Sequence, residues 1–137
     1  MRPTVDDPQT YQIIGAAMDV HCTLGRGFLE SVYRAALMLE LRRRSVPTAA
    51  EVPFRVCYKG DVLPVLFRAD LVCFGSVIVE VKAAKALGSA DLSQAINYLR
   101  VSGLRKGLLL NFGTGSLQCQ RVALESAVRL IKSLSTR

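Results

Sequence analysis

The segment from residue 67 to residue 82 limits the possible folds more than any other part of the chain. It contains two apolar, largely β-branched stretches separated by Phe74-Gly75-Ser76, a pattern typical of two antiparallel strands joined by a short loop. With this loop, Asp70 lies directly opposite Glu80, and opposed residues share a face with Cβ atoms about 5 Å apart. Lys82 follows two residues later and returns to that face. The sequence therefore predicts a hairpin with two carboxylates and a lysine on one patch.

This patch has the composition of a metal-dependent phosphodiesterase site. Paired carboxylates suit a hard divalent cation such as Mg²⁺ or Mn²⁺, which prefers oxygen ligands. We expect Asp70 and Glu80 to be ligands, and the backbone carbonyl of Val81 can turn towards them. Lys82 would position or deprotonate the attacking water, or stabilise charge on the phosphorane. The alternative is a structural salt bridge between Lys82 and either acid at a solvated sheet edge.

Helices are predicted on both sides of this hairpin in the sequence. Residues 8–22 form a helix that an aspartate at position 6 or 7 could cap. After a glycine-containing break, residues 28–44 form a second helix, whose expected apolar face is Phe28, Val32, Ala35 and Leu39. Residues 90–101 form the third, which Gly103 ends.

The remaining segments are strands and a terminal helix. Residues 52–58 and 63–67 are predicted as a first strand pair leading into the strand of Asp70, and their prolines indicate either a position towards a sheet edge or irregular strand starts. Residues 105–112 are apolar in the middle, as befits the sheet interior, and residues 117–122 are a further candidate strand. Residues 123–134 have the pattern of an amphipathic helix that could cover the sheet or make a dimer contact.

Four helical residues extend the candidate site. Glu30 begins the second helix and is another acid, although it could simply pair with Arg34 four residues later. Gln94 and Tyr98 are also four residues apart, so they share one helix face. The hydroxyls of Tyr98 and of Tyr33 could reach the site carboxylates.

These motifs together resemble a known family. The chain is similar to the small GxxExxY family within the PD-(D/E)xK nuclease superfamily over about residues 13–122. The matching motifs, in order, are Gly27-x-x-Glu30-x-x-Tyr33, Arg68-Ala69-Asp70, Glu80-Val81-Lys82, Gln94-x-x-x-Tyr98 and Leu108-Leu109-Leu110-Asn111-Phe112-Gly113.

The resemblance implies a restriction-endonuclease-like α/β fold with a mixed sheet. Its core would be a helix, three antiparallel strands, a helix and a strand, with extra N- and C-terminal helices within a single domain of residues 1–137. It implies Glu30, Asp70 and Glu80 as acidic site residues, with Glu30 reaching the metal through water. It also implies Lys82 as the catalytic lysine and Gln94 as a helix-borne orienting residue.

The functional expectation is a Mg²⁺- or Mn²⁺-dependent nuclease, with DNA favoured over RNA as the substrate. Candidate phosphate contacts are Arg68, Lys85 and Tyr98. The alternatives are a catalytically silent nucleic-acid-binding module and a regulatory or assembly subunit, each retaining the fold. Strandedness, endonuclease or exonuclease action, the number of metals and the oligomeric state, including a homodimer, stay open.

Composition agrees with a globular nucleic-acid-binding domain. The 137 residues carry a formal net charge of +7, which attracts phosphates, and Arg42-Arg43-Arg44 is either a helix-end cluster or a phosphate contact. The scattered cysteines form no zinc motif, and Cys57 and Cys73 are expected to be buried thiols. No apolar run is long enough for a membrane span, and the N-terminus lacks a signal-peptide pattern, so a cytoplasmic location is expected.

Overall fold

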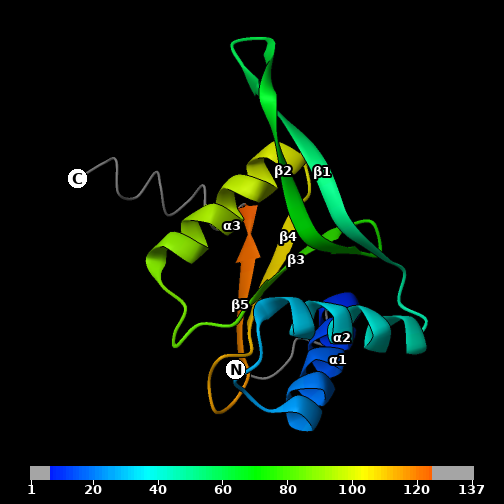
Figure 1. Ribbon diagram of the computed structural model, residues 1–137. Coiled ribbons are helices and arrows are strands. Elements are labelled where there is room, and N and C mark those ends of the chain that lie inside the picture. Colours follow the sequence, from blue (N-terminus) through cyan, green and yellow to red (C-terminus); the bar gives the residue numbers. More distant parts are fainter. Residues whose placement is uncertain (1–6, 125–137) are drawn as a thin grey trace.

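The computed structural model describes residues 7–124 of the chain. In this range three helices pack on a five-stranded sheet with strand order β1-β2-β3-β4-β5 (Figure 1). The elements are α1 (Pro8–Leu24), α2 (Glu30–Arg43), β1 (Thr48–Tyr58), β2 (Asp61–Cys73), β3 (Val77–Lys82), α3 (Ser89–Ser102), β4 (Lys106–Asn111) and β5 (Gln118–Ala123). Strands β3 and β4 are parallel and all other neighbours are antiparallel. The predicted mixed α/β sheet is therefore confirmed.

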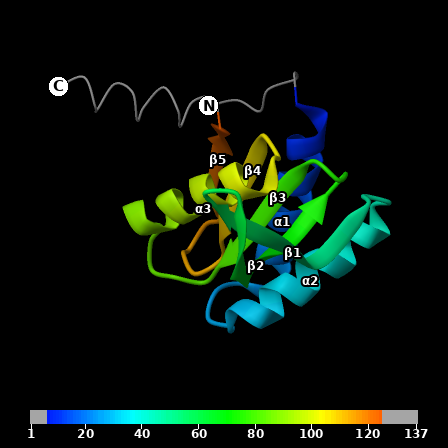
Figure 2. The same cartoon turned by 90° about the horizontal axis from the view of Figure 1, so that it is seen from above.

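The sheet is covered on both faces in its centre. Helices α1 and α2 lie on one face and α3 lies on the other (Figures 1 and 2). Because side chains alternate along a strand, Val77, Val79 and Val81 of β3 pack with α1 and α2, whereas Ile78 packs with α3. This double coverage explains the unbroken apolar run of β4. The same alternation directs the side chains of Glu80 and Lys82 towards α3.

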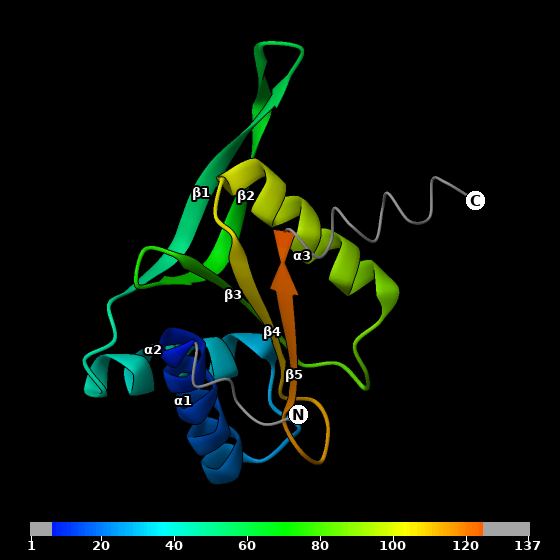
Figure 3. The same ribbon diagram turned by 180° about the vertical axis from the view of Figure 1, so that it is seen from behind.

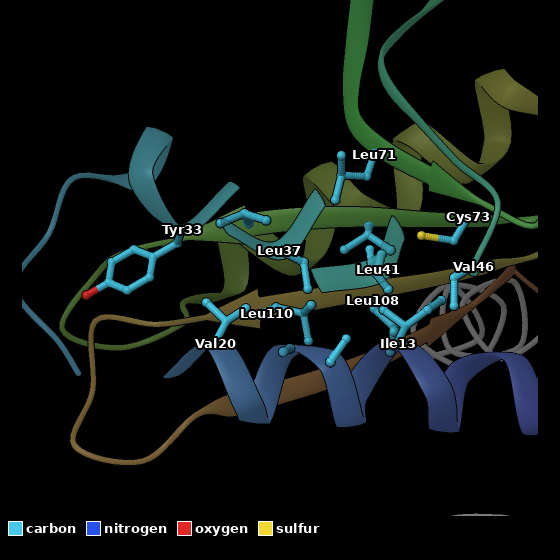
Figure 4. Packing of buried hydrophobic residues seen from close by; sticks show 14 of the residues in the cluster. Ile13, Val20, Tyr33, Leu37, Leu41, Val46, Leu71, Cys73, Leu108 and Leu110 are labelled. Carbon is cyan, nitrogen blue, oxygen red and sulfur yellow. The ribbon is translucent and has the colours of Figure 1, made fainter. Parts of the chain in front are cut away.

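The buried face of α2 differs from the predicted one. Its core residues are Tyr33, Leu37 and Leu41, and Figure 4 shows Leu37 and Leu41 in the layer between α1 and the sheet. The predicted stripe of Phe28, Val32, Ala35 and Leu39 is wrong, because Phe28 precedes the helix and the large members of the stripe are exposed. Both sets of residues have helical spacing, and the choice between them is made by tertiary contacts, such as the stacking of Tyr33 on Phe112 with ring centroids 4.8 Å apart.

Strands β1 and β2 continue beyond the rest of the sheet as a two-stranded arm, defined here as residues 52–69. Only the last three residues of β2, Leu71 to Cys73, pair with β3, and the arm projects away from the other strands (Figures 1 and 3). The arm begins where the ladder is interrupted: Glu51 has a positive φ of 51°, and the pair that it would form with Asp70 is missing. The predicted edge position of this hairpin is confirmed, since β1 is an edge strand.

Other predictions have mixed outcomes. The candidate strand at residues 117–122 is confirmed as β5, whereas the predicted terminal helix at residues 123–134 lies outside the described residues after Leu124. Cys73 is buried as predicted, but Cys57 is exposed because it lies near the turn at the end of the arm. Among residues 7–124, no helix is both long and apolar enough to cross a membrane.

Candidate active site

The centre of the candidate site is the fork at which β2 separates from β3. The last ladder pair is Leu71 with Val79. Beyond this pair, carboxylate side chains accept the hydrogen bonds of backbone amides in place of strand carbonyls. The amide of Asp70 donates to Glu80 Oε2 at 2.8 Å, and the amide of Val81 donates to Asp70 Oδ2 at 2.8 Å. Buried backbone amides need acceptors, so the two carboxylates are fixed by the strands that carry them. Asp70 and Glu80 thus lie side by side, as the loop length predicts.

Glu80 is a buried acid whose charge is poorly compensated. Its side chain is 6% exposed. Burial, and then the negative charge of Asp70, raise the pKa of Glu80 to about 7, although the bond from the Asp70 amide and the charge of Lys82 oppose this rise. Near neutral pH the fork therefore favours a bound proton or a bound cation.

Glu30 approaches the fork through Arg34. Arg34 Nη1 lies 3.4 Å from Asp70 Oδ1 and 3.9 Å from Glu30 Oε1, so one guanidinium joins the two acids. The simple pairing of Glu30 with Arg34 is therefore present, but it also ties Glu30 to the fork. The contact between Arg34 and Asp70 was not predicted, because the sequence reveals only the local spacing of Glu30 and Arg34.

Tyr33 fixes the loop that precedes Glu30. Its buried hydroxyl donates to the carbonyl of Gly25 at 2.6 Å and accepts from the amide of Phe28 at 3.2 Å. The expectation that this hydroxyl reaches the site carboxylates is wrong, because the loop between α1 and α2 uses both of its bonds. Gly27, within this loop, has a φ of 115°, which favours glycine. The Gly-x-x-Glu-x-x-Tyr spacing thus sets the start of α2 and the position of Glu30.

Lys82 is oriented by α3 and not by the two carboxylates. Its Nζ lies 3.4 Å from Gln94 Oε1 and 3.8 Å from Asp91 Oδ1. No ion pair joins Lys82 to Asp70 or Glu80 in the described range, and β3 is central in the sheet. The alternative of a salt bridge at a solvated edge is therefore wrong. Asp91 was missed because it also accepts a bond from the Gly88 amide at the start of α3, so its sequence position indicates only a helix cap.

The predicted phosphate contacts are arranged around this centre. Tyr98 stacks on Phe67 with ring centroids 4.1 Å apart. Burial, followed by the charges of Glu80 and Asp70, raises the pKa of Tyr98, while a hydrogen bond with Gln94 lowers it. Arg68 and Lys85 are exposed. Tyr98 therefore lies next to the acids, whereas the two cations are on the surrounding surface.

Asn111 holds the chain that leaves Lys82. It is fully buried and pairs with Lys82 across the parallel strands. Its side chain donates to the carbonyl of Ala84 at 3.0 Å and accepts from the amides of Ala84 at 2.9 Å and Gly113 at 3.1 Å. A Cβ at Gly113 would collide with the backbone of Ala84. The Asn111-Phe112-Gly113 sequence thus positions the end of β3, a role that spacing alone did not indicate.

The donor set suits a hard cation bound through two carboxylates. Over residues 7–124, no group of three or more His, Cys, Asp and Glu side chains converges to hold a metal ion. Mg²⁺ is commonly bound through one or two carboxylates and keeps several waters, so Asp70 and Glu80 are sufficient for this binding mode. Glu30 is outside this pair.

Comparisons with known proteins agree with this architecture. No curated protein is significantly similar in sequence. The crystal structure of SSO0001 has a similar fold, with a TM-score of 0.56 and 19% identity over 74% of this chain and 55% of that one. The chain thus spans little more than half of that structure. Residues 7–122 match the PD-(D/E)XK nuclease superfamily, whose nucleases generally use divalent metals and act on nucleic acids. A match over most of the sequence suggests a nuclease-type function and shows that the chain belongs to the PD-(D/E)XK nuclease superfamily.

Proposed function

We propose that this protein is a nuclease of the GxxExxY family that hydrolyses phosphodiester bonds with Mg²⁺ or Mn²⁺, with DNA favoured over RNA. The observation that carries the proposal is the carboxylate pair at the fork. Asp70 and Glu80 are held together by backbone amides, and burial with the neighbouring charge raises the pKa of Glu80 to about 7. A purely structural cluster would place a cation on Glu80, whereas the nearby lysine is bonded to α3.

In this proposal Asp70 and Glu80 hold the ion, with the Val81 carbonyl as a further ligand and Glu30 contributing through water. When bound, the ion would neutralise the scissile phosphate and acidify a water molecule. Lys82 positions or deprotonates the attacking water, or stabilises charge developing at the phosphorus. Its bonds to Gln94 and Asp91 limit its rotamers, so these two residues act by positioning it.

Three residues are proposed to contact the substrate phosphates. Arg68 is an exposed cation two residues before Asp70 on β2, and Lys85 is an exposed cation three residues after the end of β3. Tyr98 lies beside Gln94 on α3. We propose that they orient the phosphodiester for attack. Their contacts would be charge-assisted or hydroxyl hydrogen bonds to phosphate oxygens.

The test is cleavage of labelled single- and double-stranded DNA and RNA in Mg²⁺, Mn²⁺ or EDTA. Lys82→Ala and Asp70→Ala are compared with wild type and with Lys59→Ala, a matched lysine change at the exposed turn of the arm. We expect metal-dependent cleavage that falls by at least about a hundredfold in the two site variants and persists in Lys59→Ala. Circular dichroism and thermal unfolding verify that each variant is folded.

Two results would contradict the nuclease proposal, and a third would revise it. Cleavage that persists in EDTA or in folded Lys82→Ala would indicate a different catalyst or a contaminant. Absence of cleavage with every substrate and metal, together with salt-sensitive nucleic-acid binding that persists in Asp70→Ala, would favour a catalytically silent binding module. Activity that appears only with a partner would favour an assembly subunit.

A further inference from the structure

A basic groove lies between the arm and α3, next to the candidate active site. Its volume is about 660 Å³, and its walls include Arg55, Cys57 and Phe67 of the arm and Tyr98 and Arg100 of α3. The stacked rings of Phe67 and Tyr98 connect the two walls. The groove is thus a surface built jointly by the arm and the helix that orients Lys82.

The charge of this groove is uniformly positive. Arg55 and Arg100 are exposed, and the described lining contains no Asp or Glu. Neither guanidinium forms an ion pair with any residue from 7 to 124. Two guanidinium groups on facing walls, without an ion pair in the described part of the chain, suit phosphates, to which arginine donates two parallel hydrogen bonds.

The groove is continuous with the residues that orient Lys82. Gln94 contacts the Lys82 amine at 3.4 Å and is hydrogen-bonded to Tyr98, which lines the groove. Arg100 is six residues after Gln94, which corresponds to about 9 Å along a helix. The groove therefore extends from the contact between Gln94 and Tyr98 towards the Arg100 end of α3.

We propose that one strand of the nucleic-acid substrate passes from Lys82 through the groove, with Arg55 and Arg100 contacting its phosphates. The inference rests on the proposed function, because it assigns the path of the substrate to the same site. It also gives the projecting arm a role as one wall of the binding surface. The alternative cluster, Arg42 and Arg43, lies at the opposite end of α2 from Glu30, about 18 Å along the helix.

The first experiment measures binding without catalysis. Fluorescence anisotropy in EDTA compares Arg55→Gln/Arg100→Gln with Arg42→Gln/Arg43→Gln, which removes the same charge from a different surface. Labelled single- and double-stranded DNA of one sequence are titrated at several salt concentrations. Losing two phosphate contacts should reduce the salt slope by about 1.4 for a single strand or about 1.8 for a duplex. We expect the groove variant to bind at least about tenfold more weakly and the control to change by less than about twofold.

The second experiment uses the exposed thiols of the wild-type protein. Cys57 lines the groove, whereas Cys22 lies on α1 away from it. At saturating DNA in EDTA, N-ethylmaleimide should modify Cys57 more slowly than in free protein, and Cys22 should react at an unchanged rate. Peptide mass spectrometry measures both rates in one sample.

Three results would contradict the proposal that DNA binds in the groove. The wild type could bind neither single- nor double-stranded DNA, the groove and control variants could bind with equal affinity, or Cys57 could react at the same rate in protein saturated with DNA as in free protein. These results do not depend on turnover. If cleavage is absent but only the groove variant loses binding and Cys57 is protected, the proposed binding site is supported and the nuclease proposal fails. If cleavage occurs and the groove variant binds normally, the nuclease proposal is supported and the proposed binding site is wrong.

Discussion

Replacing Glu80 with glutamine should stabilise the protein at pH 8 in EDTA. Burial and the charge of Asp70 raise the pKa of Glu80 from its ordinary 4.5 to about 7. A raised pKa means that the folded state binds the proton more tightly than the unfolded state. The stabilisation from this proton is complete below pH 4.5, declines as the pH rises, and is lost above about pH 7.

The size of the effect follows from the two pKa values. The difference between the pKa values of 4.5 and about 7 is about 2.5, and each pKa unit corresponds to about 1.4 kcal/mol, so the buried charge costs at most about 3–4 kcal/mol. Glutamine has a similar shape, carries no charge and keeps an oxygen that can accept the amide hydrogen of Asp70. We therefore expect Glu80→Gln to raise the free energy of unfolding by about 1–3 kcal/mol at pH 8 and to have little effect at pH 4.5.

Urea denaturation followed by circular dichroism measures this free energy at pH 4.5, 6 and 8. The matched control is Glu51→Gln, which removes the same charge from an exposed position on β1 and should change the free energy by less than about 0.5 kcal/mol at every pH. A Glu80→Gln protein that is less stable than wild type at pH 8, or that keeps the pH dependence of wild type, would refute the interpretation that Glu80 is a strained buried acid.

Three further predictions concern residues outside the carboxylate pair. Tyr33→Phe leaves the Gly25 carbonyl without its donor and should lower the free energy of unfolding by about 1–3 kcal/mol in urea. Gly113→Ala introduces a Cβ against the backbone of Ala84 and should destabilise by roughly 1–3 kcal/mol, seen as a lower Tm. Burial raises the pKa of Cys73 to about 11, so alkylation at pH 8 should modify it at least about tenfold more slowly than the exposed thiols, as mass spectrometry will show.

The position of the two acids could be predicted because it depends on local geometry. A loop of Phe74 to Ser76 fixes the register of the hairpin, which the Cys73–Val77 and Leu71–Val79 pairs confirm. The sequence does not predict that the ladder stops at the next position. That break involves the positive φ of Glu51 and the departure of the arm, a property of the neighbouring strand that no pattern around Asp70 reveals.

Predictions failed where the spacing of apolar residues in the sequence was compatible with more than one tertiary arrangement. The residues of α2 have apolar spacing on two sides, and only the contact of Tyr33 with Phe112 identifies the buried one. The strand pattern around Cys57 is correct, but alternation does not say whether another element covers this part of the strand, and Cys57 is exposed. The Arg34–Asp70 contact joins residues 36 positions apart, beyond any local spacing rule.

The distribution of charge at the fork supports the proposed metal site. Arg34 is shared by Glu30 and Asp70, and Lys82 is paired with Asp91, so in the described structure the nearby cations are already engaged and Glu80 forms no ion pair. A cluster kept for stability would gain by placing a cation on Glu80, because an unpaired buried charge is costly. The fold instead fixes Glu80 beside Asp70 through backbone bonds. This arrangement leaves a deficit of positive charge next to Lys82, which a divalent ion would supply.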